Sequence, residues 1–202
     1  MQGAAITVDN LYALDASAES VGVARTDFYC GDPVVVVNFT GLPPDSYALA
    51  ILHATGVAKP QQVALILSES VEHRCLLAGF FNKPMTEADH DGLWYWASAR
   101  QFAKNGKNWD AWFYYRTAAY FLNPVEFLSS PNLENLQREE DEVHLASLPG
   151  AKPLMLDAHG SVFQVTSIET TAALGAFDLE VHYIPDVAET AQLQIVQAPG
   201  DR

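Results

Sequence analysis

The sequence predicts an α+β fold with a β-rich first part, a central helical hairpin followed by a third helix, and antiparallel strands near the end. Short apolar runs separated by glycine and proline fill residues 1–85. From Thr86 onward the apolar residues recur at helical spacing, and after Gly150 apolar and polar residues alternate. We therefore expect a β-rich sheet region at 1–85 and a helical hairpin followed by curved strands at 86–202, or one continuous domain.

The first region is expected to be an antiparallel meander or sandwich. Residues 34–39 form a continuous, mostly β-branched run, which predicts a strand covered on both faces. A strong turn signal, GLPPD, follows this run. Further strands are predicted at residues 47–54, 63–67 and 75–81.

Two antiparallel helices are predicted within residues 90–124, which hold all four tryptophans of the chain. Thr86 or Asp89 is expected to cap the first helix, because both side chains can accept a hydrogen bond from a free backbone N–H. Gly106 is expected to end the first helix and Pro124 the second.

A third helix is predicted to begin at Ser130, with Pro131 at its first helical position. Its acidic run at residues 139–142 is interpreted as a solvated face. Beyond it, alternation predicts half-buried strands around residues 163–166 and 177–183, and a weaker strand at residues 192–196.

Composition and charge exclude several classes of partner. The chain carries 25 acidic and 11 basic side chains, a net charge of −14, which disfavours nucleic acid and anionic membrane surfaces. No apolar run approaches the ~20 residues of a spanning helix, so membrane insertion is not expected. The first residues lack the pattern of a signal peptide. A mature exported protein and a cytoplasmic one both fit this sequence.

The predicted hairpin resembles a single tetratricopeptide-type unit. The resemblance rests on small and aromatic residues at intervals of three to five: Ala99, Phe102, Gly106, Ala111, Tyr115 and Ala118. The chain has no second copy, and a solenoid needs about three stacked units to bury a continuous core. The resemblance therefore implies a lone hairpin that packs on the neighbouring strands.

Two broader resemblances bear on fold and function. Residues 90–96, 111–115 and 127–134 are similar to a family of uncharacterised bacterial proteins that are often exported. This resemblance implies no catalytic residue. Residues 74–81 resemble the last strand of cone-shaped NTF2-like domains, and residues 86–196 have the element order of such domains. A fold-level analogy of this kind leaves the function open.

Our leading hypothesis is a non-enzymatic binding or scaffold protein. The residues expected to form its contacts or helix seam are Trp94, Trp96, Trp112 and Tyr115. These aromatic side chains are either buried between sheets or form an exposed groove for a protein, a peptide, a glycan or a small apolar ligand.

The rival hypothesis is an NTF2-like ligand carrier or enzyme with a pocket between the C-terminal strands and the helices. Its polar groups are expected to be His90, Glu180 and His182. Motifs for a nucleophilic serine or a phosphate-binding loop are absent, so no cofactor and no catalytic residue are predicted. The acidic cluster around His90 is explained by helix capping, and no metal site is predicted.

Cys30 and Cys75 are the two cysteines of the chain, and neither lies in a metal-binding motif. Both lie beside predicted strands. They are interpreted either as one disulfide, in an oxidising compartment, or as two separate buried thiols.

Overall fold

The computed structural model describes residues 3–70, 72, 74–143, 145, 148–149, 152–158, 161–171 and 177–185. It confirms the α+β class, with three helices and antiparallel strands among these residues. The chain divides into two compact units, Met1–Val143 and His144–Arg202. The change from strands to helices, which we placed near residue 85, occurs at residue 92, and the division between the units lies after residue 143.

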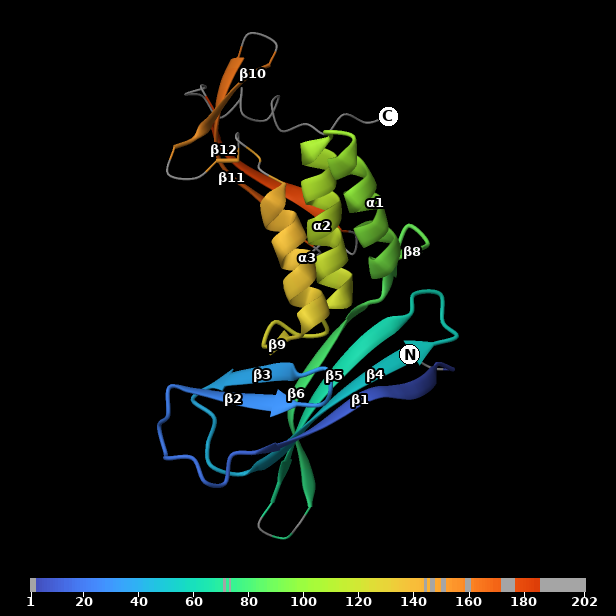
Figure 1. The fold of residues 1–202 in the computed structure, drawn as a ribbon, viewed down its shortest axis with the longest axis vertical. Coiled ribbons are helices and arrows are strands. Elements are labelled where there is room, and N and C mark those ends of the chain that lie inside the picture. Colours follow the sequence, from blue (N-terminus) through green and yellow to red (C-terminus); the bar gives the residue numbers. More distant parts are fainter. Residues whose placement is uncertain are drawn as a thin grey trace. The chain divides into compact units, whose positions relative to one another are not determined.

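The first unit is built on a four-stranded antiparallel sheet (Figure 1). Its strand order is β1-β4-β5-β6, formed by β1 (Ala5–Asp15), β4 (Ser46–Thr55), β5 (Gln61–Glu69) and β6 (Cys75–Pro84). A smaller sheet in the order β2-β3-β9 contains β2 (Arg25–Cys30), β3 (Val35–Thr40) and β9 (Leu128–Ser129). The predicted strands of residues 47–54, 63–67 and 75–81 are thus present. The strands β1, β2 and β9 were not predicted from the sequence.

The core of the first unit lies between the two sheets. One face of the large sheet contributes Leu14, Leu49, Ile51 and Ala64, which pack with Val37 of β3. Val125 and Leu128, which follow the second helix, complete this cluster. Within the predicted strand at residues 34–39, Val37 alone is fully buried, so this strand is covered less completely than its sequence predicts.

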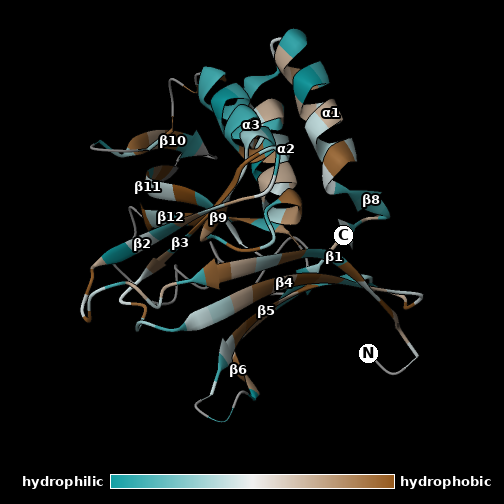
Figure 2. Ribbon diagram, turned by 60° about the horizontal axis from the view of Figure 1, so that its bottom comes forward, coloured by the Kyte–Doolittle hydropathy of each residue, from teal (hydrophilic) through white to brown (hydrophobic). Residues whose placement is uncertain are grey.

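Three helices follow the large sheet and pack side by side (Figure 1). They are α1 (Gly92–Lys104), α2 (Asn108–Leu122) and α3 (Pro131–Glu142). Gly106 joins α1 to α2 with a φ of +69°, the left-handed backbone conformation that favours glycine. Residues of α3 are mostly hydrophilic, whereas β4 and β5 carry hydrophobic stretches (Figure 2).

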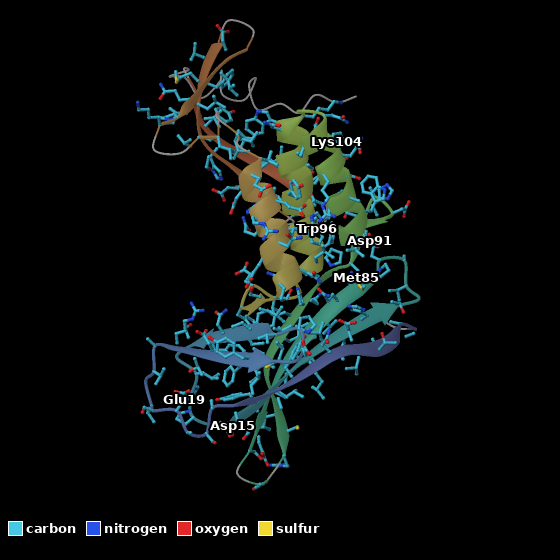
Figure 3. All side chains as sticks on the ribbon, viewed as in Figure 1. Asp15, Glu19, Met85, Asp91, Trp96 and Lys104 are labelled. Atoms are coloured by element: carbon cyan, nitrogen blue, oxygen red, sulfur yellow. The ribbon has the colours of Figure 1, made fainter. Side chains whose placement is uncertain are left out.

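The start of α1 differs from the prediction. Thr86 and Asp89 do not cap it, because residues 86–91 form a small hairpin of β7 (Thr86–Glu87) and β8 (His90–Asp91). Its turn at residues 88–89 has positive φ values, which are incompatible with a continuing helix. Asp91 caps α1 instead, and its carboxylate accepts a hydrogen bond from the backbone N–H of Trp94 at 2.8 Å. Asp91 and Lys104 mark the two ends of α1 in Figure 3.

The second unit contains an antiparallel sheet in the order β10-β11-β12. Its strands are β10 (Leu154–Ala158), β11 (Ser161–Thr171) and β12 (Asp178–Pro185). β11 and β12 correspond to the two predicted C-terminal strands. The strand β10 was not predicted from the sequence. The weaker strand predicted at residues 192–196 lies outside the described residues.

Candidate functional site

The aromatic residues of the helical hairpin separate into a buried and an exposed group. Trp112 and Tyr115 are buried on α2. Trp96 is half-buried on α1. Trp94 is 40% exposed and stacks on the imidazole of His90, with ring centroids 3.5 Å apart. Trp94 and His90 therefore form a pair at the surface, and the ring of the buried Tyr95 lies 5.1 Å from that of Trp94.

Glu139 of α3 joins the three helices. Its carboxylate accepts hydrogen bonds from Trp96 Nε1 at 2.8 Å, from two guanidinium nitrogens of Arg100 at 2.7 Å each, and from Tyr115 Oη at 3.3 Å. The guanidinium of Arg100 also lies 4.5 Å from the ring centroid of Trp96. The hydrogen bond from Arg100 is the main reason that the pKa of Glu139 is lowered. Burial, followed by the charge of Glu139, raises the pKa of Tyr115 to about 12.

The interpretation of residues 139–142 as a solvated face is therefore wrong for its first two members. Glu139 is held in the network of Trp96, Arg100 and Tyr115, and Glu140 is buried. Burial raises the pKa of Glu140, whose ion pair with Arg116 spans 3.6 Å. Asp141 and Glu142 are exposed, as the interpretation requires.

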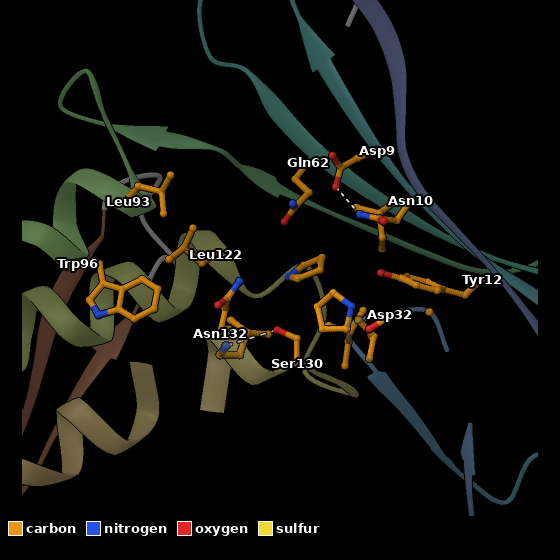
Figure 4. Close-up of a pocket in the computed structure, with 17 residues that line it drawn as sticks. Asp9, Asn10, Tyr12, Asp32, Gln62, Leu93, Trp96, Leu122, Ser130 and Asn132 are labelled. Carbon is orange, nitrogen blue, oxygen red and sulfur yellow. Dashed lines mark hydrogen bonds between the residues drawn. The ribbon is translucent and has the colours of Figure 1, made fainter. Parts of the chain in front are cut away.

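A pocket of about 440 Å³ lies between the large sheet and the helices of the first unit (Figure 4). We call it the sheet–helix pocket. One wall comes from the sheet, and the other comes from the start of α1, the end of α2 and the start of α3. Its main side chains are Asp9, Asn10, Tyr12, Asp32, Val35, Ile51, Gln62, Leu93, Trp96, Leu122, Leu128, Ser130, Asn132 and Leu133. The volume lies in the range of small-molecule sites, about 300–1,000 Å³.

A β-bulge places polar groups on the sheet wall. The register of β1 against β4 shifts between Val8 and Asn10, and a bulge of this kind changes the direction of a side chain. As a result two consecutive residues, Asp9 and Asn10, line the pocket, and the Asn10 amide donates to the Asp9 carboxylate at 2.7 Å. Figure 4 shows this pair beside Gln62 and Tyr12.

Gln62 is a lining residue of the pocket whose side chain lacks a full set of hydrogen-bond partners among the described residues. It lies opposite His53 in the sheet, and its amide nitrogen is 3.4 Å from His53 Nε2. Its Oε1 atom is buried and has no hydrogen-bond partner among the described residues. A buried acceptor without a partner is costly, which makes this oxygen a candidate acceptor for a ligand.

Sequence reasoning found Trp96 and missed the rest of this pocket. A signal for Gln62 was present, because it has the same strand parity as the core residues Ala64 and Ile66. A polar residue at a core-facing position of a strand indicates a partner or a site. The lining residues of β1 gave no such signal, because β1 was not predicted as a strand.

Lys83 connects the sheet to the end of α2 beside this pocket. Its ammonium group donates to the backbone carbonyl oxygens of Tyr120 and Asn123 and lies 5.0 Å from the ring centroid of Tyr120. Burial lowers the pKa of Lys83 to about 8, and the nearby carboxylate of Glu126 opposes this shift. The two carbonyl groups at a helix C-terminus favour the charged amine, so we assign Lys83 a structural role.

The other predicted site residues lie elsewhere. Glu180 and His182 are neighbours on one face of β12, with Glu180 Oε1 and His182 Nε2 3.0 Å apart, and both side chains are about half exposed. Cys30 and Cys75 are free thiols, so the disulfide is not formed. The alternative of two buried thiols is also incorrect, because Cys75 is exposed.

The described residues contain no group of three or more His, Cys, Asp or Glu side chains able to hold a metal ion. None of the described helices is long and apolar enough to cross a membrane.

Comparison with known proteins returns no match to a family model, to a curated protein or to a solved structure. The resemblances to tetratricopeptide units, to NTF2-like domains and to an uncharacterised bacterial family stay predictions.

Proposed function

We propose that the protein is a binding protein that takes a small amphipathic ligand, neutral or cationic, in the sheet–helix pocket. The observation that carries this proposal is the mixed lining of the pocket. It combines apolar side chains, including Leu93, Trp96 and Leu122, with a few polar ones, including Asn10 and Gln62 on the sheet wall. Small-molecule sites combine an apolar lining with a few placed polar groups in this manner.

The charge of the pocket supports a neutral or cationic ligand. Asp9 and Asp32 contribute two carboxylates, and none of the described lining residues is basic. The chain as a whole carries a charge of −14. An anionic ligand would lose its hydration without gaining an opposite charge, whereas an ammonium or hydroxyl group would find acceptors.

The hydrogen-bonding groups support a ligand with a donor at one end. The unpartnered Oε1 atom of Gln62 accepts a hydrogen bond but cannot donate one. Burial raises the pKa of Tyr12, so its hydroxyl group stays protonated at neutral pH and can act as donor or acceptor. A primary amine or an alcohol on an aliphatic or aromatic body fits this arrangement.

A matched set of probes tests the proposal. Hexylamine, hexanol and hexanoate share one aliphatic body and differ in the charge of the head group. Isothermal titration at neutral pH is expected to show binding of hexylamine and hexanol and at least tenfold weaker binding of hexanoate, a difference of about 1.4 kcal/mol. Equal binding of all three probes would contradict the assigned head-group site.

A pair of neighbouring glutamines provides the control. Gln62→Leu removes the unpartnered acceptor, and Gln61→Leu makes the same change at a residue that is absent from the described lining. We expect Gln62→Leu to weaken hexylamine binding at least tenfold, about 1.4 kcal/mol, and Gln61→Leu to leave it unchanged. If both variants bind hexylamine like the wild type, Gln62 is not part of the ligand site.

A further inference from the structure

The face of the large sheet that points away from the core, which we call the outer face, carries two apolar rows that cross all four strands. The register places Leu11, Ala50, Leu65 and Phe80 in one row across the sheet. The next row is Ala13, Ala48, Leu67 and Leu77. These two rows contain no charged or polar side chain, in a chain with a net charge of −14.

The outer face is open at both edge strands. Val8 and Leu11 on β1 are each 66% exposed, and Leu77 and Phe80 on β6 are 61% and 51% exposed. Several large apolar side chains on one face of a sheet, each more than half exposed, are unusual for a surface that contacts only solvent. We infer that the outer face is the contact surface of a homodimer, in which a second copy of this chain packs sheet against sheet.

The relief of the outer face is self-complementary. On this face the inner strand β4 carries Ala48, Ala50, Leu52 and Ala54, of which Ala50 and Ala54 are buried, whereas the edge strands present the larger, exposed Leu11 and Phe80. In a dimer with two-fold symmetry each patch meets itself, so the ridge of one copy can lie over the alanines of the other. Aligned or orthogonal packing of two sheets about 10 Å apart produces such interdigitation.

The size and charge of the outer face also fit a second copy. Four strands spaced ~4.8 Å apart with about eight residues each give a flat footprint of roughly 500 Å², before the relief of the side chains is counted. A specific dimer buries about 600–1,000 Å² of accessible surface per partner. The flat footprint lies just below this range, and the exposed side chains of Leu11, Leu77 and Phe80 add to it. Because each copy is strongly acidic, two copies can meet at the uncharged rows of the outer face without placing like charges together.

Sedimentation equilibrium of the full 202-residue chain in reducing buffer tests the inference. The wild type is expected to sediment at twice the monomer mass of 22.1 kDa. Val8→Glu and Leu77→Glu each place a carboxylate in the contact, at edge positions that are exposed within the first unit. Each variant is expected to raise the dimer dissociation constant about 100-fold or more while the circular dichroism spectrum is unchanged.

Val21→Glu is the matched control, because Val21 is 89% exposed and lies outside the large sheet. This variant is expected to remain dimeric.

A wild type that is monomeric at all concentrations overturns the inference. This holds both if the outer face is exposed to solvent in the monomer and if another part of the same chain covers it. Dimers that persist in both Val8→Glu and Leu77→Glu, or that dissociate equally in Val21→Glu, overturn it as well. The result is independent of ligand binding in the sheet–helix pocket.

Discussion

Two adjacent glutamates of α3 show how much one position in the sequence changes the role of a side chain. Glu139 receives hydrogen bonds from Trp96, Arg100 and Tyr115, whereas Glu140 is buried with one carboxylate oxygen that has no partner in the part of the chain that the structure describes. The sequence shows both as members of an acidic run. The partners on α1 and α2 lie 24 to 43 residues away along the chain, so the acidic pattern could not reveal either role.

We predict that the same substitution has opposite effects at these two positions. Glu139→Gln removes the charge that pairs with Arg100, and should lower the free energy of unfolding by about 1–2 kcal/mol. Glu140→Gln removes a desolvated charge with a distant partner, and should leave stability unchanged or raise it by ~1 kcal/mol. Urea unfolding at pH 7 measures both changes. A loss of stability in both variants would contradict the assigned environment of Glu140.

The pH dependence of the two variants provides a separate check. The pKa of Glu139 is lowered, so its stabilisation is complete above the ordinary glutamate value of 4.5 and is lost as the pH falls below it. The difference between wild type and Glu139→Gln should therefore shrink below that pH. The pKa of Glu140 is raised, so the cost of its charge disappears as the pH falls through the folded value toward 4.5. A pH-independent difference for Glu139→Gln would contradict the network.

At the scale of elements, local signals predicted boundaries well where they acted within a few residues. Pro124 and Ser130 correctly marked the end of α2 and the start of α3. β1 was missed, because its residues alternate weakly and its regularity is interrupted by the bulge near Asp9. The hairpin at residues 86–91 was missed because its polar residues also suit a helix N-terminus, and its positive φ values leave no clear mark in the sequence.

The contact between the start of α1 and the end of α2 gives a prediction at this scale. A Cβ atom at Gly92 would lie 2.6 Å from Leu122 Cγ, so Gly92→Ala should push the helix ends apart and cost about 1–3 kcal/mol. Leu122→Ala removes the two nearest obstructing atoms, Cγ and Cδ2 of Leu122. We expect the double variant to lose less unfolding free energy than the two single variants lose together. The difference should exceed ~0.5 kcal/mol in urea unfolding. Additive losses would show that the two residues do not obstruct each other.

At the scale of the molecule, the α+β class and the order of its main parts could be predicted, because each part has its own periodicity. The sheet–helix pocket could not. Its lining comes from β1, from residues 31–35, from β4 and β5, and from the ends of all three helices. Sequence patterns report which face of an element is apolar, but they do not report which distant faces meet. Trp96 was named from the sequence as an aromatic contact residue, without the polar residues opposite it.

The most direct test of the ligand site is to follow the four indole N–H signals of the protein by NMR while hexylamine is added. Among the tryptophans, Trp96 alone belongs to the described lining of the pocket, and Trp94 is stacked on His90 at the surface. We predict that the Trp96 signal shifts in a saturable manner while those of Trp94, Trp109 and Trp112 stay in place. A saturable shift of Trp94 with no change at Trp96 would contradict the sheet–helix pocket and favour the exposed aromatic surface instead.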